Sequence, residues 1–132
     1  EGCVLKDLGV DSHTIAAASG SLVVGADSFL VLGVADDPAV NGGLSVDYAY
    51  GAGFLLANGD DEVVLECGGV EICAIAYDDG TTFPDPTGVS MSLDPTFFNA
   101  SDYSDGTRWC ESVTPFGDGD LGTPGAANDT CP

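Results

Sequence analysis

The sequence predicts an all-β domain, most simply a β-sandwich, and two observations carry that prediction. Apolar residues arrive in short runs rich in β-branched and aromatic side chains, and clusters of Gly, Asp, Asn, Pro and Ser separate these runs. No stretch has apolar residues at the 3.6-residue period of an amphipathic helix. At 132 residues the chain suits one domain with one core, so we treat residues 1–132 as a single unit.

Eight short segments have the composition of strands, and their spacing is typical of a sandwich with short connections. In chain order they are Cys3–Leu8, His13–Ile15, Ser21–Val24, Ser28–Val34, Leu44–Tyr50, Glu62–Cys67, Val70–Tyr77 and Val89–Leu93.

The clearest local unit is a β-hairpin around Gly68-Gly69, a dipeptide that tolerates the positive φ angles of a tight type I′ turn. With these glycines as the loop, Cys67 is expected opposite Val70, Leu65 opposite Ile72, and Val63 opposite Ala74, all on one apolar face. Cys73 then lies on the other face of the hairpin. This geometry argues against a bridge between Cys67 and Cys73, because a disulfide needs Cβ atoms about 4 Å apart.

Residues from about 79 to 132 are expected to form long but ordered loops. This part is rich in the turn formers Gly, Asp, Pro, Ser and Thr. It also carries large aromatic side chains, which flexible linkers rarely do: Phe97, Phe98, Tyr103, Trp109 and Phe116. We therefore expect this tail to fold back over the core.

The charge balance is strongly acidic, with 22 Asp and Glu against Lys6 and Arg108, a formal net charge of -20. Affinity for nucleic acids and for anionic membrane surfaces depends on clustered Lys and Arg, so both classes of partner are disfavoured. No apolar run approaches the roughly 20 residues of a membrane-spanning helix, so membrane insertion is not expected. Such a surface instead suits cations, basic partners or high ionic strength.

Five cysteines, no C-x-x-C pair and a single histidine favour disulfides over a zinc site. Structural disulfides persist in oxidising compartments, which indicates a secreted or cell-surface protein. The odd number leaves one cysteine over.

Catalysis is not expected. His13 is the only histidine, and its neighbours Asp11 and Ser12 do not form a catalytic triad merely by being adjacent in sequence. The acidic run Asp60 to Glu62 could supply paired carboxylates, but nothing in the sequence predicts the cleft that such chemistry needs.

Calcium is the one cofactor that the residues suggest. Asp118 and Asp120 lie in a turn that resembles the start of an EF-hand loop, without the later ligands. Asp102 and Asp105 form a weaker candidate. In both places turn formation is the competing explanation for the aspartates.

Nearly the whole chain resembles bacterial lamin tail domains. The most specific motifs are Tyr77-Asp78 with Phe83-Pro84-Asp85, Ser92-Leu93-Asp94-Pro95, and Trp109-Cys110 with Leu121-Gly122-Thr123-Pro124-Gly125. The resemblance implies an immunoglobulin-like β-sandwich that serves as an interaction module without catalytic residues. In sequences of this subtype the cysteines imply two disulfides, Cys3–Cys67 and Cys110–Cys131, which leaves Cys73 unpaired or free for an intermolecular bond.

Lamin tail domains usually begin with strands of the type EWIELYN, whereas this chain opens at Gly2-Cys3-Val4-Leu5. The resemblance therefore implies that an opening strand or two is lacking. We expect the strand Cys3–Leu8, or its neighbour, to have an unpaired edge that recruits a strand from a protein partner or from a second copy.

Three functions follow as hypotheses. The first is an extracellular structural or protein-interaction module, a subunit of a surface assembly or filament. The second is an accessory domain that targets a secreted hydrolase, and the third is a calcium-dependent binder of surfaces or carbohydrates.

Overall fold

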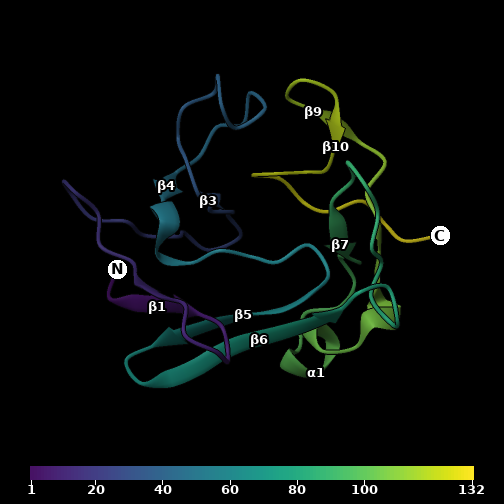
Figure 1. The fold of residues 1–132 in the computed structure, drawn as a ribbon, viewed down its shortest axis with the longest axis horizontal. Helices are drawn as coiled ribbons and strands as arrows, with labels where there is room; N and C mark the ends of the chain where they lie inside the picture. Colours follow the sequence, from purple (N-terminus) through teal and green to yellow (C-terminus); the bar gives the residue numbers. More distant parts are fainter.

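Four antiparallel strands form the largest sheet in the computed structural model, which describes residues 1–132. They are β1 (Cys3–Lys6), β2 (Ser12–Thr14), β5 (Asp60–Cys67) and β6 (Val70–Asp78). Their order is β2-β1-β5-β6, so β1 is paired on both sides, while β2 and β6 are the edges. Figure 1 shows this sheet along the bottom of the molecule, with the other segments above it and to its right.

The β5–β6 hairpin turns at Gly68-Gly69 as predicted, with φ angles of 60° and 79°. Cys67 pairs with Val70, but the predicted register fails further along, because a β-bulge between Leu65 and Glu66 shifts the pairing by one residue. Leu65 lies opposite Cys73. Directly paired residues share a face, so the prediction that Cys67 and Cys73 point to opposite faces is wrong.

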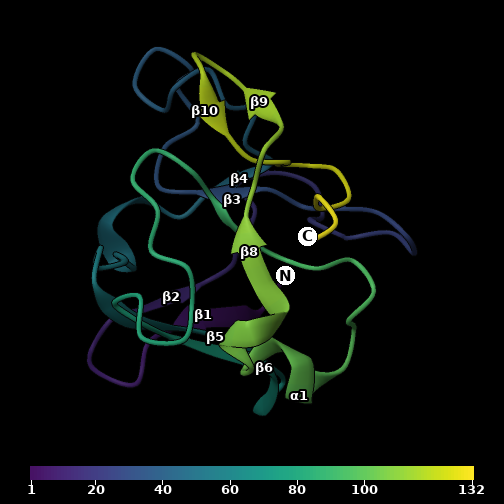
Figure 2. The same ribbon diagram turned by 90° about the vertical axis from the view of Figure 1, so that its right-hand side faces the viewer.

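Three two-stranded sheets complete the strand content. They are the parallel pair β3 (Leu32–Gly33) and β4 (Tyr48–Ala49), and the antiparallel pairs β7 (Met91–Leu93) with β8 (Trp109–Glu111) and β9 (Pro115–Phe116) with β10 (Asp120–Leu121). A parallel bridge from Val89 to Leu121 joins the last two pairs. Figure 2 shows β8 rising from the main sheet toward β9 and β10.

Helical structure is limited to single turns: η1 (Gly51–Gly53), α1 (Ala100–Tyr103) and η2 (Gly106–Arg108). None of these helices is long and apolar enough to cross a membrane. The prediction of a fold built mainly from β-strands is confirmed. The immunoglobulin-like arrangement of these strands stays a prediction.

Several predicted strands are shorter or absent. Ser21–Val24 forms no strand, and its valines are exposed. Only β3 remains of Ser28–Val34, and only β4 of Leu44–Tyr50. Extended segments without a neighbour to receive their hydrogen bonds do not become strands, whatever their composition.

The hydrophobic core is small. Only 10 of the 132 residues are buried, and the central cluster consists of Leu5, Ile15 and Phe54. Leu65 packs against this cluster from β5, which places the cluster over one face of the main sheet, while its neighbour Val64 is buried on the other face. A second contact joins Phe83 to Trp109 in the tail, with ring centroids 5.8 Å apart. The tail also folds onto an earlier segment, because Asp118 donates its backbone N–H to the Gly42 carbonyl at 3.0 Å.

Both disulfides implied by the lamin tail resemblance are present. Cys3–Cys67 joins directly paired residues of β1 and β5, and Cys110–Cys131 ties β8 to the C-terminal segment. Cys73 has no partner within the chain. Because few residues are buried, we expect these two disulfides to contribute much of the stability of the folded chain.

Candidate functional site

Four aspartates act as clamps for the loops of the tail, and each accepts a hydrogen bond from a threonine hydroxyl: Asp78, Asp94, Asp105 and Asp129. At Asp94, Oδ1 accepts bonds from the N–H and hydroxyl of Thr96, and Oδ2 accepts the Cys131 N–H at 2.9 Å. The threonine hydroxyl is the largest of the causes that lower the pKa of all four carboxyls. These aspartates are structural anions.

His13 serves as a link between β2 and β4. Its Nε2 lies 2.7 Å from the hydroxyl of Tyr48, which also accepts the Ala16 N–H at 3.1 Å. Asp11 accepts the Leu55 N–H instead of orienting the imidazole. The structure thus gives His13 neither an orienting carboxylate nor a nucleophile, the two partners that a histidine base requires.

The acidic residues at the start of β5 accept hydrogen bonds from neighbouring loops. Asp61 accepts the Ala57 N–H at 2.7 Å, and Glu62 accepts the Leu8 N–H at 3.3 Å. Burial, followed by the negative charges of Asp61, Asp60 and Glu62, raises the pKa of Tyr77 to about 12. The neutral Tyr77 hydroxyl donates to the Ala57 carbonyl, so this cluster closes the loop that leads into β5.

The two aspartates of the predicted calcium turn lie beside the glycine pair Gly42-Gly43. Asp118 donates its backbone N–H to the Gly42 carbonyl at 3.0 Å, and Asp120 lies in β10. No group of three or more His, Cys, Asp or Glu side chains converges in the structure to hold a metal ion. Asp102 completes the capping box of α1 by accepting the Asn99 N–H, and Asp105 is the N-cap of η2. A calcium site at Asp118 and Asp120 stays a hypothesis that needs further oxygen ligands.

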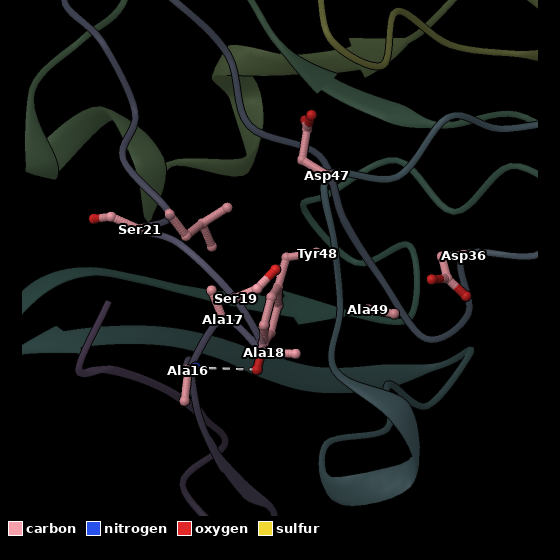
Figure 3. A pocket seen from close by; sticks show the side chains of 10 residues that line it. Ala16, Ala17, Ala18, Ser19, Ser21, Asp36, Asp47, Tyr48 and Ala49 are labelled. Carbon is pink, nitrogen blue, oxygen red and sulfur yellow. Dashed lines mark hydrogen bonds between the residues drawn. The ribbon is translucent and has the colours of Figure 1, made fainter.

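A hollow of about 380 Å³ opens between the loop Ala16–Leu22 and the segment Asp47–Ala49. Figure 3 shows the Tyr48 side chain in its centre, while the carboxylates of Asp36 and Asp47 lie apart at its margin. Asp47 accepts the Val31 N–H at 2.8 Å. With alanines as most of its apolar wall and its carboxylates separated, this hollow has no convergent set of reactive groups.

A larger groove, about 490 Å³, lies between the loop at residues 27–29 and the tail. We call it the aromatic groove. Its lining residues are Asp27, Ser28, Phe29, Leu93, Asp94, Pro95, Phe97, Phe98, Tyr103, Ala127 and Asn128. The sequence placed Phe97, Phe98 and Tyr103 in an ordered tail. It gave no signal that Phe29 lines the same groove, because Phe29 lies more than sixty residues earlier in the chain.

The free edge of β6 is the second exposed feature. Among the backbone hydrogen bonds outside the strand ladders, none involves residues 70–77, so β5 is the only backbone partner of this stretch. Near the hairpin turn, Val70 and Ile72 are 61% and 51% exposed. Figure 1 places α1 below the end of β6 that is farther from the turn. The turn-proximal half of the edge is therefore open.

A scan against protein-family models found no match to this chain, and neither did searches of curated proteins and of solved structures. The resemblance to lamin tail domains therefore rests on the sequence motifs alone and stays a prediction.

Proposed function

We propose that this domain is a non-catalytic interaction module of the extracellular space or cell surface, which assembles with a second copy of itself through the free edge of β6. The observation that carries the proposal is the unpaired backbone of this nine-residue strand beside exposed Val70 and Ile72. A sheet edge of this kind offers backbone donors and acceptors to an added strand.

The charge pattern of β6 allows two copies to pair. Between Glu71 and Asp78 the strand carries no charged residue. Two copies can therefore pair in antiparallel fashion along this uncharged stretch, beyond the bulge residue Ile72. No carboxylate then faces another across the interface, although like charges directly opposed would destabilise it.

A non-catalytic role is supported by the structural contacts of the side chains that could otherwise take part in catalysis. His13 is bound to Tyr48, and the acidic residues of β5 hold backbone N–H groups of neighbouring loops. The two disulfides are of the kind that persists in oxidising compartments, which supports a location outside the cytoplasm. An interaction module with an immunoglobulin-like sandwich is also what the lamin tail resemblance implies.

The test is sedimentation of the chain 1–132 at micromolar and millimolar concentrations, with and without the substitution Ile72→Lys. A lysine in the middle of an edge strand opposes strand addition. The matched control is Val113→Lys, which places the same charge on a residue that is 73% exposed and lies beyond the end of β8.

We expect concentration-dependent dimers or larger species of the native chain and of Val113→Lys, and loss of these species in Ile72→Lys. A monomer at all concentrations would contradict the proposal, and so would assembly that Ile72→Lys leaves unchanged. Melting curves of the three proteins show whether each is folded, so that loss of assembly is not mistaken for loss of structure.

A further inference from the structure

We infer that the aromatic groove binds a basic peptide segment, with an arginine or lysine side chain seated on its exposed aromatic rings. This inference concerns a different surface from the β6 edge and does not depend on the proposed assembly. It rests on the solvent-exposed aromatic rings of the groove, on Arg108, which already stacks on a groove ring, and on the negative charge of the protein.

Two rings in the groove are open to solvent. Phe98 is 73% exposed and Phe29 is 54% exposed, although large aromatic side chains usually bury most of their surface. Aromatic faces attract Lys and Arg within about 6 Å of the ring centroid. The groove therefore presents ring surface that a cationic side chain can cover.

Arg108 shows this mode of binding within the chain itself. Its guanidinium carbon lies 4.2 Å from the centroid of Phe97, a lining residue, and its Nε lies 3.3 Å from the Asp105 carboxylate. The cation is thus held by an aromatic face and a carboxylate together. The groove lining also contains an aromatic ring and a carboxylate in Phe29 and Asp27, and Asp27 takes part in neither of the ion pairs of the protein.

Charge complementarity selects a basic occupant. Both basic side chains of the protein are already paired, Lys6 with Glu66 and Arg108 with Asp105. The remaining formal charge is strongly negative, at -20 for the chain, and Asp27 and Asp94 lie in the groove wall. At this groove, Asp27 and Asp94 repel an acidic segment and attract a basic one over the distance that salt screening allows.

The groove is held in shape before any ligand arrives. The Tyr103 hydroxyl donates to the Phe98 carbonyl at 2.9 Å, and the Asn128 amide donates to the Leu93 carbonyl at 2.8 Å. The Cys110–Cys131 disulfide ties the C-terminal wall to β8. A preformed site binds with a smaller loss of conformational entropy than a flexible one.

The experiment is an NMR titration of the labelled chain at about 0.15 M salt, where exposed charges are screened beyond about 8 Å. The probes are a short glycine peptide with two arginines and its neutral counterpart with citrulline in both places.

The protein variants are Phe98→Leu, which keeps an apolar side chain but removes the ring, and Asp27→Asn. The rescue variant is Phe98→Trp. The control is Asp118→Asn, which removes one charge from the β9–β10 turn, away from the groove.

We expect shifts of groove residues with the arginine peptide and much weaker shifts with the citrulline peptide. Phe98→Leu should weaken binding about two- to five-fold, as loss of an exposed cation–π contact does, and Phe98→Trp should restore it. Asp27→Asn should weaken binding more than Asp118→Asn.

Three results would overturn the inference. They are equal binding of the citrulline peptide, equal weakening by Asp27→Asn and Asp118→Asn, and shifts spread over the whole acidic surface. A neutral oligosaccharide that shifts the groove residues while the arginine peptide does not would assign the groove to carbohydrate instead. Because Phe98 is exposed, its variants should fold, and their melting curves verify this.

Discussion

Cys3 and Cys67 lie directly opposite each other on β1 and β5, with their Cα atoms 4.2 Å apart and their sulfurs bonded. The bond closes a loop with a sequence separation of 64, which runs from the start of β1 to the end of β5 and contains β2, β3 and β4. It therefore fixes the first strand of the chain to the centre of the main sheet, next to the small core around Leu5.

Removal of this bond by Cys3→Ser with Cys67→Ser should lower the free energy of unfolding by about 4 kcal/mol, on the chain-entropy account of disulfides. The Cys110–Cys131 bond closes a shorter loop, with a separation of 21. Its removal should lower the free energy of unfolding by about 3 kcal/mol. Urea unfolding measures both. Cys73→Ala is the control because Cys73 forms no bond. A larger loss from the shorter loop would contradict the entropic account.

Phe54 is the most buried large side chain of the central cluster, at 2% exposure, and its ring meets Tyr50 with centroids 5.7 Å apart. Phe54→Ala should destabilise the fold by about 3 to 5 kcal/mol, through lost burial and the cavity that remains. Phe98→Ala removes the same atoms from an exposed site and should change stability by no more than about 0.5 kcal/mol. Equal effects in thermal unfolding would mean that the core does not centre on Phe54.

Acid should weaken the tail through its aspartate clamps. Hydrogen bonds from Thr96 and Cys131 lower the pKa of Asp94 below its value in the unfolded chain. A lowered carboxyl pKa gives stability that is fully present above the unfolded value, about 3.9, and that is lost as pH falls through the folded value.

The substitution Asp94→Asn should therefore destabilise the protein at about pH 6, and this difference from the native chain should shrink toward about pH 3. Asp118→Asn is the control because the Asp118 side chain forms no hydrogen bond with the rest of the chain. Protonation of the other acidic residues reduces charge repulsion in every variant alike. This effect therefore cancels when the unfolding free energies of Asp94→Asn and Asp118→Asn are compared. A difference that is constant with pH would refute the clamp role of Asp94.

Salt should stabilise this protein. The formal charge of -20 opposes compaction, and added salt shortens the screening length from about 30 Å at 0.01 M to about 3 Å at 1 M. We expect the melting temperature to rise over that range in sodium chloride and equally in potassium chloride. A falling melting temperature would show that specific ion pairs, such as Lys6–Glu66, outweigh the general repulsion.

The sequence predicted best what depends on adjacent residues. The turn at Gly68-Gly69 forms as expected because both glycines adopt positive φ angles that suit a tight hairpin. The bulge in β6 was not predictable, because alternation gives no sign that Ile72 is the extra residue. That single insertion reversed the expected face of Cys73.

Features that depend on distant segments were harder to predict. Ser21–Val24 has a strand-like composition, yet no other segment pairs with it. Conversely, β8 forms because Glu111 pairs with Met91 of β7, a strand that lies in another part of the tail. The aromatic groove has the same origin, since Phe29 and Phe98 are brought together by packing rather than by a motif.

Hydrogen exchange of the peptide 70–78 as a function of protein concentration tests the role of the β6 edge most directly. Its outward-facing amides lack partners in a single copy, so they exchange quickly until a second strand covers them. We predict that their protection rises with concentration, that the amides of β2 on the opposite edge do not change, and that Ile72→Lys abolishes the rise. Exchange of residues 70–78 that is independent of concentration, in a chain that sediments as a monomer, would contradict assembly through β6.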